Sequence, residues 1–412
     1  MQEKVLIEKL IPGGQALGTL SSGQKIFLWN ALPEETVLEY QITKQKSHYL
    51  EAIATKIDHP SPHRIAPQDP CFLSTSPWQI MDFAYELAQK QNLVQESLTQ
   101  AHVDLTGLTI EPTRTDNHEW HYRNKMEYAL YWNHDLQKIQ LAFHNRGTHG
   151  KLPITQSSLE RPEIFQAATK IIDELNRTHD EARNYQSLLL RTNQHGEVSG
   201  GLFKNKQPHP AFKNLTDQIL GHAYSYSPNG FFQINLPVYT IALQEIAKHI
   251  TTENVLDLYA GVGTIGLSVA RDHNLTLVEV NGAAFAELKT NCRGTTARPV
   301  LAKSEDALDY IAPDQSVILD PPRAGCDQKL IERLLDQTPK PSSTSPATPP
   351  PKPATFASSP KPKNTNSPAS PPSTSSPKLP TSKTSSSSPA SKSQKPPLRT
   401  NRNPSEIHAR KS

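Results

Sequence analysis

The sequence predicts an α/β protein of several domains with a disordered tail, and three observations support this prediction. Short apolar runs alternate with turn residues over residues 1–58, which is typical of a small β-barrel. Over residues 224–337, apolar strands alternate with helical stretches, the pattern of a doubly wound parallel sheet. Beyond that point the chain becomes a run of Ser, Pro, Lys and Thr.

Residues 1–58 are predicted to form a small, OB-like β-barrel. Its expected strands are Val5–Ile7, Gln24–Trp29, Thr36–Ile42 and Leu50–Ile57, with turns at Pro12–Gly14 and Leu32–Glu35. Strands this short and regularly spaced favour a barrel over helices. Residues 59–67, which include one Ser-Pro and one Ala-Pro step, have the composition of a linker.

Residues 68–223 are predicted to form an α+β domain, followed by the parallel-sheet domain over residues 224–337. The first domain should open with a helix over Trp78–Leu98, because apolar residues recur there with an approximate helical period. A mixed region follows, which contains Tyr122–Tyr128 and Gly201–Phe203. No internal repeat is visible in the sequence.

The tail, residues 338–412, differs in charge from everything before it. From Pro339 onward it holds 18 of the 36 prolines, 12 Lys and Arg, and one acidic residue, and no glycine. Its formal charge is therefore about +11, against about −8 for the preceding residues. Such a segment cannot bury enough apolar surface to offset its chain entropy, so we predict that it is disordered.

Cysteine usage and the N-terminal residues indicate a soluble, cytoplasmic protein. Cys71, Cys292 and Cys326 are the three cysteines of the sequence, which is too few for a disulfide framework or a four-ligand metal site, so we expect no metal. The first residues lack the cationic start and apolar core of a signal peptide. No apolar run approaches the roughly 18 residues that a membrane span requires.

The most specific motif is Asn254–Gly266, in which an apolar strand runs into a glycine turn that opens a helix. Glycines let the backbone approach a ligand, and the helix N-terminus offers free N–H groups. Glu279 ends the next apolar strand, 22 residues beyond Asp257, where an acid can hydrogen-bond ribose hydroxyls. A glycine turn alone also serves tight packing, but this combination indicates a nucleoside-containing cofactor. Asp257 at the strand end favours S-adenosylmethionine.

Two further segments lie beside this motif in the sequence. In Ser316–Arg323 an apolar strand ends in Asp320 and two prolines, which stiffen the loop that follows. A rigid strand-to-helix turn is the alternative, but the position one strand past Glu279 favours the ligand-binding edge of the sheet. In Tyr226–Asn235, Phe231 and Phe232 are expected in the core. Gln233 interrupts that apolar run, either as a satisfied structural amide or as a ligand contact.

Together these segments resemble the S-adenosylmethionine-dependent RNA uridine-5-methyltransferases, over about residues 3–337. The resemblance implies that residues 1–58 are a TRAM domain, the RNA-binding barrel of that family, from the Gly13-Gly14 turn, the Ala31–Glu34 segment and the Ser61–Arg64 exit. It implies a Rossmann-like methyltransferase domain over residues 224–337. The implied cofactor contacts are Gln233, Tyr259, Glu279 and Asp320.

Two departures from the family concern cysteine. Many relatives hold an iron–sulfur cluster with four cysteines, whereas the matching stretches here keep Cys71 and have serine at Ser158, so we predict no cluster. Uracil carbon 5 accepts a methyl group only after a thiolate adds to carbon 6. The family's nucleophilic Ser-Cys-Asn-Pro segment and its basic glutamate have no counterpart after the helix expected at Lys329–Leu335. Cys326, near Asp320, is more simply a small buried residue than a replacement nucleophile.

A third departure concerns the sheet itself. The segment that would supply the family's last three strands is missing, so Ser316–Leu319 should become an exposed edge of a truncated sheet. The break near Thr338 suggests a frame-shifted end or a truncation, while a native basic tail that binds RNA phosphates is the alternative.

The resemblance implies an enzyme that methylates uridine carbon 5 in ribosomal or transfer RNA and that acts as a monomer. The alternative is a non-catalytic protein that binds RNA and S-adenosylmethionine, favoured by the absent nucleophile. Methylation of an amino nitrogen is less favoured, because such enzymes usually carry Asn rather than Asp before the Pro-Pro pair. Candidate RNA-binding residues are Lys44, Lys46, His48, Arg123, Lys125, Arg146, Lys204 and Lys206, and the pairs around Arg123 and Lys204 are preferred.

Overall fold

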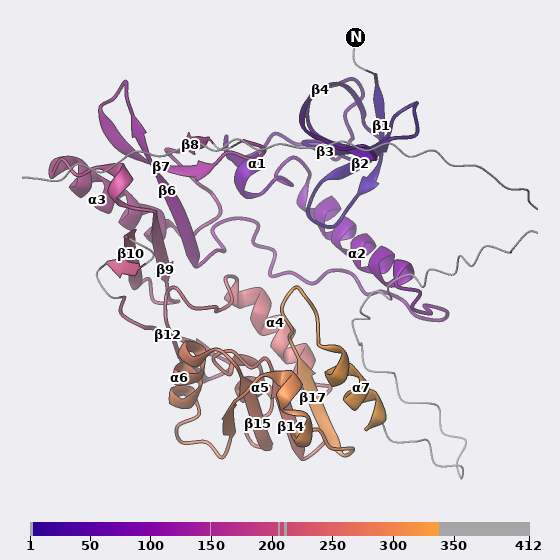
Figure 1. Cartoon of the computed structure of the whole chain (residues 1–412), viewed down its shortest axis with the longest axis vertical. Helices are drawn as coiled ribbons and strands as arrows, with labels where there is room; N and C mark the ends of the chain where they lie inside the picture. Colours follow the sequence, from indigo (N-terminus) through magenta and orange to yellow (C-terminus); the bar gives the residue numbers. More distant parts are fainter. Residues whose placement is uncertain (1–2, 149, 205–206, 210–211, 338–412) are drawn as a thin grey trace, which may run out of the picture. The chain divides into compact units, whose positions relative to one another are not determined.

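The computed structural model describes residues 3–148, 150–204, 207–209 and 212–337 (Figure 1). The tail predicted to be disordered and the candidate Lys206 lie outside these residues. Within the described ranges, no helix has both the length and the apolar character needed to cross a bilayer.

The N-terminal strands close into a five-stranded barrel, which confirms the predicted barrel and the mixed α/β class. The strands are β1 (Val5–Leu10), β2 (Ala16–Thr19), β3 (Lys25–Trp29), β4 (Thr36–Gln45) and β5 (Tyr49–Ile57), in the order β1-β2-β3-β5-β4. All neighbouring pairs with registered partners are antiparallel except β3 and β5, which are parallel. Strand β2 was not predicted, because its sequence is short and contains Gly18.

Residues 59–67, which have the composition of a linker, are anchored to the barrel. Arg64 donates to both carboxylate oxygens of Glu35 at 2.6 and 2.8 Å. Glu35 is completely buried and also accepts from the backbone N–H groups of Leu32 and Ser61. A buried carboxylate is tolerated here because every one of these donors is directed at it.

The helix predicted over Trp78–Leu98 begins later than expected. Helix α2 spans Phe83–Gln100, after the short helix α1 (Phe72–Thr75), and its N-cap Asp82 accepts from the backbone N–H of Tyr85. Ile80 and Met81 instead pack into the barrel core. The predicted start was wrong because these apolar residues belong to a turn buried under the barrel rather than to a helical face.

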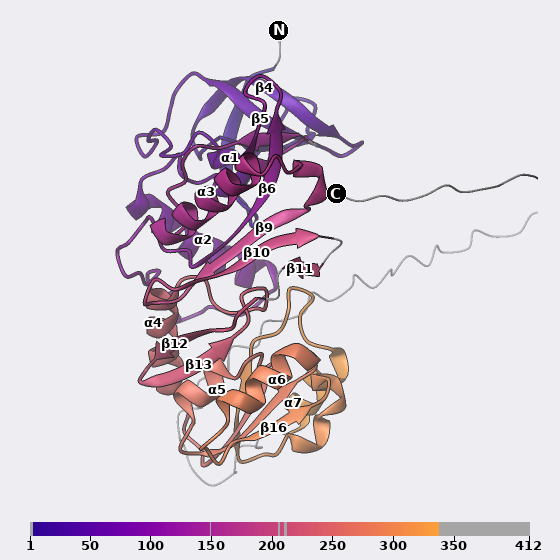
Figure 2. The same ribbon diagram turned by 90° about the vertical axis from the view of Figure 1, so that its left-hand side faces the viewer.

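The central domain is a six-stranded sheet covered by one helix. Its strands are β6 (Lys125–Asn133), β7 (Lys138–His144), β8 (Lys151–Pro153), β9 (Ser187–Thr192), β10 (Val198–Lys204) and β11 (Gln207–His209), in the order β11-β10-β9-β6-β7-β8. Figure 2 shows β6, β9 and β10 side by side. Helix α3 (Pro162–Arg177) packs its apolar face on the sheet, followed by the 3₁₀ turn η1 (Ala182–Asn184).

The C-terminal domain contains a four-stranded parallel sheet in the order β16-β15-β14-β17. Its strands are β14 (Asn254–Leu258), β15 (Asn274–Glu279), β16 (Arg298–Leu301) and β17 (Gln315–Leu319). Its helices are α4 (Leu236–Ala247), α5 (Thr264–Val269), α6 (Gly282–Asn291) and α7 (Gln328–Asp336), with the turns η2 (Ser304–Asp306) and η3 (Leu308–Tyr310). As expected, β17 lies at one edge of the sheet (Figure 1).

The two faces of this sheet are both covered, as the doubly wound pattern predicts. On one face Val255 and Leu277 pack with side chains of α4, α5 and α6. On the other face Leu256 and Val278 pack with Leu330 of α7 and with the η2–η3 segment. Successive strand residues therefore point to opposite sides, and both sides are apolar.

A two-stranded hairpin, β12 (Leu215–Ile219) and β13 (His222–Tyr226), connects the central sheet to the parallel sheet. Its buried side chains pack with the core of the parallel-sheet domain. The boundary predicted between the α+β domain and the parallel-sheet domain, at residues 223 and 224, falls inside β13. Its exact position stays a prediction.

Candidate cofactor site

The carboxyl ends of three parallel strands meet at one edge of the C-terminal sheet. In the register of β14, Asp257 pairs with Leu277 of β15 and with Ile318 of β17. Consequently Tyr259 follows β14, Glu279 ends β15 and Asp320 follows β17, all at the same edge. This is the edge at which ligands bind in open α/β sheets.

The glycine turn between β14 and α5 has the backbone geometry that only glycine adopts without strain. Gly263, the N-cap of α5, has φ +87°, in the left-handed region. A Cβ built on it would lie 2.5 Å from Cδ1 of Leu288. Both the dihedral angle and the close packing against α6 therefore require glycine at this position.

Asp257 is completely buried beneath this turn and has one unsatisfied oxygen. Its Oδ2 accepts from the backbone N–H of Gly266 at 2.9 Å, while Oδ1 has no hydrogen-bond partner. Burial, together with the neighbouring carboxylates of Asp320 and Glu279, raises the pKa of Asp257 to about 7, against the opposing effect of the Gly266 hydrogen bond. A free, buried acceptor at the sheet edge is a feature that a bound group can satisfy.

Glu279 holds the turn through its side chain. Its Oε2 accepts from the backbone N–H of Gly261 at 2.8 Å, and its Oε1 accepts from that of Asn281 at 2.5 Å. A carboxylate has about four lone-pair sites, so acceptor capacity remains for hydroxyl donors of a ligand. Glu279, which its spacing from Asp257 predicts as a partner of ribose hydroxyls, is thus fixed in position by two backbone N–H donors.

Tyr259 lies at the mouth of the same turn in a left-handed conformation, with φ +65°. Burial and the adjacent Cys326 raise the pKa of the Tyr259 hydroxyl to about 12, while a hydrogen bond from Ser304 opposes this. Burial likewise raises the pKa of the Cys326 thiol, although its hydrogen bond with Tyr259 works in the other direction. Cys326 is therefore held as a neutral thiol that contacts Tyr259.

Asp320 completes a group of three carboxylates at the sheet edge. Partial desolvation raises the pKa of Asp320, although the residue is exposed, and the carboxylates of Asp257 and Asp320 both raise the pKa of the partly buried Tyr239. Glu279 and Asp320 place acidic side chains where the parallel strands end, beside Asp257, whose carboxyl keeps its proton up to about pH 7. Such a field favours a ligand that carries positive charge.

Gln233 comes from a different part of the chain than the other three predicted contacts. It lies in the segment between β13 and α4, where its carbonyl accepts from Nδ2 of Asn124 at 2.9 Å. Among the described residues, no hydrogen bond joins the side chain of Gln233 to Tyr259, Glu279 or Asp320. Its role as a cofactor contact remains a prediction.

The prediction that Phe231 and Phe232 both lie in the core is correct for only one of them. Phe232 is buried as expected and stacks on Tyr226 with ring centroids 3.8 Å apart. Phe231, also expected in the core, is 78% exposed. The turn at Ser227–Gly230 reverses the backbone, so two adjacent side chains in an apolar run point in opposite directions.

Two exposed apolar residues at the same edge were not predicted from the sequence. Val280, directly after Glu279, is 56% exposed, and Leu301, the registered partner of Glu279 at the end of β16, is 55% exposed. For Val280, its place directly after an acid at a parallel strand end is the signal that could have identified it, whereas the position of Leu301 depends on the register between β15 and β16.

Several candidate RNA-binding cations already have partners. Lys44 pairs with Glu51 at 2.7 Å, and the guanidinium of Arg146 lies 4.0 Å from the ring centroid of Trp29. Lys125 donates to backbone carbonyls of the segment before α4. These contacts give each cation a structural role in addition to any role at the surface.

The positions that resemble cluster ligands carry a polar network instead. Ser158 donates to the buried Asp69 through its hydroxyl at 2.6 Å, and Gln79 donates to the same carboxylate at 3.0 Å. Burial raises the pKa of the Cys71 thiol to about 11. No group of three or more His, Cys, Asp or Glu side chains with the geometry of a metal site occurs among the described residues.

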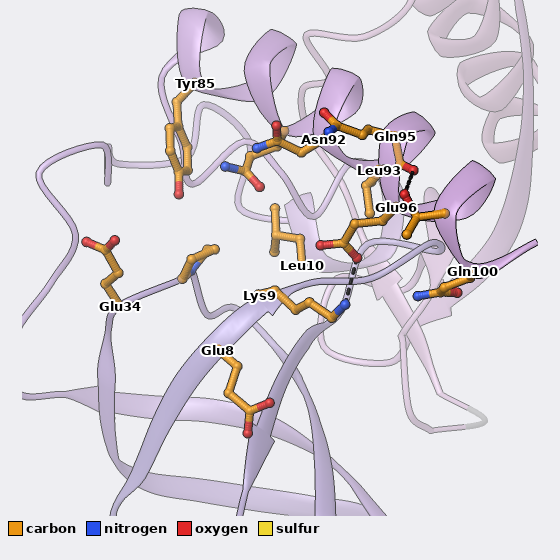
Figure 3. Close-up of a pocket in the computed structure, with 13 residues that line it drawn as sticks. Glu8, Lys9, Leu10, Glu34, Tyr85, Asn92, Leu93, Gln95, Glu96 and Gln100 are labelled. Atoms are coloured by element: carbon orange, nitrogen blue, oxygen red, sulfur yellow. Dashed lines mark hydrogen bonds and ion pairs between the residues drawn. The ribbon is translucent and has the colours of Figure 1, made fainter. Parts of the chain in front are cut away.

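A cavity of about 600 Å³ lies between barrel residues and α2, away from the carboxyl edge of the C-terminal sheet (Figure 3). Its charged lining consists of Glu8, Glu34 and Glu96 against Lys9, and the last two form an ion pair of 2.7 Å. The remaining lining is largely amide and hydroxyl side chains of α2. An excess of carboxylates makes this cavity unsuited to phosphate groups.

Comparisons with known proteins agree with the arrangement described above. Residues 240–341 match the family model described as Conserved hypothetical protein 95. An uncharacterized RNA methyltransferase of Bacillus anthracis is 26% identical, over 82% of this chain and 86% of the relative. One from Lactobacillus johnsonii is 27% identical, over 82% of this chain and 87% of the relative.

A solved structure shares the fold over most of the chain. The tRNA (uracil-54, C5)-methyltransferase of Pyrococcus abyssi, in complex with S-adenosyl-L-homocysteine, superimposes with a TM-score of 0.62 and 19% identity. The match covers 81% of this chain and 87% of that chain. At this level of identity the likeness concerns the fold.

Proposed function

We propose that this chain binds S-adenosylmethionine at the carboxyl edge of the C-terminal sheet and belongs, by descent, to the RNA methyltransferases that act on uridine carbon 5. The convergence of Asp257, Glu279 and Asp320 around a glycine turn carries the proposal. The names of the relatives and the fold of the uracil-C5 methyltransferase support it.

The residues present fit the chemical groups of this cofactor. S-adenosylmethionine carries a sulfonium cation and an ammonium group, which the acidic side chains of Glu279 and Asp320 attract. Glu279 offers acceptor capacity for the two ribose hydroxyls, and the exposed Val280 and Leu301 offer apolar contacts for the faces of the adenine. When bound, the cofactor supplies an electrophilic methyl group.

The remaining predicted contacts shape the site around that methyl group. Tyr259 closes the turn, and its hydroxyl is kept neutral by a pKa of about 12. Gln233 contributes an amide that can accept from the ammonium group or donate to the carboxylate of the cofactor.

RNA would be bound by the barrel, which we propose is a TRAM domain, and by the central sheet. Phe231 stands exposed on the same segment as Gln233 and offers a planar face to an unstacked base. Base extrusion is required because the target carbon lies within the stack of a folded RNA.

The cysteines favour a second candidate, a non-catalytic protein that binds both RNA and the cofactor. Methyl transfer to uridine carbon 5 needs a thiolate that adds to carbon 6. Cys71 and Cys292 are buried, and burial raises the pKa of each thiol to about 11. Cys326, beside the site, is held by Tyr259 with its thiol pKa raised by burial. We therefore propose that none of the three is the nucleophile.

One measurement tests the cofactor site that both candidates share, and a second separates them. Titration calorimetry with S-adenosylhomocysteine should show binding that Asp320→Asn weakens, and an absence of binding would contradict the proposed cofactor site. Tritium release from RNA labelled at uridine carbon 5 then reports turnover, with Cys326→Ala in parallel. Release that is lost in Cys326→Ala would make Cys326 the nucleophile. No release from a protein that binds the cofactor and RNA would support the non-catalytic candidate.

A further inference from the structure

The segment that carries Phe231 and Gln233 is held almost entirely through its backbone carbonyls. Asn124 donates to the carbonyl of Gln233 through Nδ2 at 2.9 Å and to that of Ile234 through its backbone N–H at 3.0 Å. Lys125 donates to the carbonyl of Gly230 at 3.2 Å. These donors all come from the start of β6 in the central domain.

Arg191 of β9 makes the most extensive contacts with this segment. Its guanidinium donates to the carbonyls of Gly230 and Gln233, at 3.4 and 3.3 Å, and to that of Phe232. It also lies 5.0 and 5.4 Å from the ring centroids of Tyr226 and Phe232. The guanidinium of Arg191 therefore binds the backbone of the turn, of the buried Phe232 and of Gln233 at the same time.

This arrangement places two cations side by side at a cost in stability. Lys125 and Arg191 are directly opposite each other in the register of β6 and β9. Arg191 is completely buried, and no ion pair with a carboxylate involves it among the described residues. Directly opposed like charges destabilise a sheet, and a buried charge needs compensation. The carbonyl groups of residues 229–234 supply that compensation.

The electrostatics agree with this geometry. Burial, together with the charge of Arg191, lowers the pKa of Lys125 to about 8. Burial also lowers the pKa of Arg191, to about 10, against the opposing influence of Tyr226, Asp217 and Glu287. On the far side, Glu287 of α6 accepts from the backbone N–H of Ser227. The segment is therefore fixed between the central sheet and the cofactor domain.

We propose that Arg191 and Lys125 are positioning residues that fix the backbone of residues 229–234, so that Gln233 is presented to the cofactor and Phe231 to the RNA. Lys125, a candidate phosphate contact from its sequence, then acts on the inside of the protein. The inference about ligands rests on the proposed function, whereas the inference about the backbone does not.

The first test uses the full chain and does not depend on any ligand. Hydrogen exchange measured by mass spectrometry should be faster in residues 227–235 of Arg191→Lys than in wild type, by about tenfold, because one ammonium group cannot replace the guanidinium fork. Lys125→Met should loosen the same residues while keeping or raising the melting temperature, because it removes one of two opposed charges. Residues 254–258 should be unchanged in both variants.

A matched control is Arg64→Lys, which removes another guanidinium from a largely buried site, beside Glu35 of the barrel. It should lower stability and leave exchange in residues 227–235 unchanged. Unchanged exchange there in both Arg191→Lys and Lys125→Met would overturn the proposal. So would equal acceleration by Arg64→Lys, because the effect would then be one of general stability.

The second test concerns the ligand. Arg191→Lys should weaken S-adenosylhomocysteine binding by about tenfold, and adding Gln233→Ala to it should weaken binding little further, because both act through one contact. Fully additive losses would overturn the positioning role. If wild type binds no S-adenosylhomocysteine, the proposed function fails, and the exchange experiment still decides whether the two cations hold the segment.

Discussion

Replacing Asp257 with Asn should change how the stability of the cofactor domain depends on pH. The wild-type carboxyl is buried, and its pKa is about 7 in the folded protein, against an ordinary value of 3.8. The folded state therefore keeps a proton that the unfolded state releases over this range. As pH rises from about 4 to 7 the free energy of unfolding must fall, and it stays at the lower value above pH 7. Asn does not titrate, so the free energy of unfolding of the variant does not show this fall with pH.

The magnitude follows from the difference between the two pKa values. Each pKa unit corresponds to about 1.4 kcal/mol, so the whole window between 3.8 and 7 represents about 4 kcal/mol. Roughly 3 kcal/mol of this lies between pH 5 and pH 8. Asn can still accept from the backbone N–H of Gly266, which keeps the fold of the turn.

Hydrogen exchange of β14 measures this directly in the domain concerned. After correction for the intrinsic pH dependence of exchange, protection of residues 254–258 should fall from pH 5 to pH 8 in wild type more steeply than in Asp257→Asn. Other titrating groups contribute equally to both proteins, so the gap between them isolates Asp257. A gap that stays constant across this range would refute the raised pKa and the buried, ionisable state assigned to this carboxyl.

Three further substitutions test the site and its surroundings. Glu279→Gln should weaken S-adenosylhomocysteine binding roughly 10- to 100-fold in calorimetry, because hydrogen bonds to a charged acceptor are the stronger ones. Gly263→Ala should lower the free energy of unfolding by roughly 2 kcal/mol in thermal melts, because its φ is left-handed and its Cβ would meet Leu288. Phe231→Ala should weaken RNA binding about tenfold in fluorescence anisotropy and leave the melting temperature unchanged, because the ring is exposed.

Matched controls make each outcome specific. Glu253→Gln alters an exposed acid before β14 and should not affect cofactor binding. Gly282→Ala, where no atom lies within 4 Å of the added Cβ, should be tolerated. Leu136→Ala removes another exposed apolar side chain and should keep RNA binding. Equal effects in a variant and its control would contradict the role assigned to that residue.

The parts of the fold that depend on local pattern were predictable from the sequence. Alternating apolar runs identified the barrel, and strand–turn–helix spacing identified the parallel sheet with its glycine turn. The same spacing placed Glu279 and Asp320 at one sheet edge, because parallel strands align their carboxyl ends, and the family resemblance added Tyr259. These features are determined by period and by turn residues, which the sequence displays directly.

Other features depend on contacts between distant segments, which no local pattern contains. Phe231 and Phe232 have the same side-chain chemistry, and only the turn held by Arg191 and Lys125 directs one outward. Similarly, Ile80 is apolar with helical spacing, but the barrel core buries it outside the helix. Periodicity reports that a side chain is apolar, whereas the partner that buries it is a tertiary property.

The order of strands in the C-terminal sheet has a consequence during synthesis on the ribosome. Strand β14 pairs first with β15, about 20 residues later in the chain, and then with β17, about 60 residues later. At roughly 5–20 residues per second, one side of β14 waits about 3 to 12 s for its partner. A translational pause between these strands would prolong the exposure of an unpaired apolar strand and lower the yield of folded protein. The same pause after Ile57 would do less harm, because every strand of the barrel has by then been made.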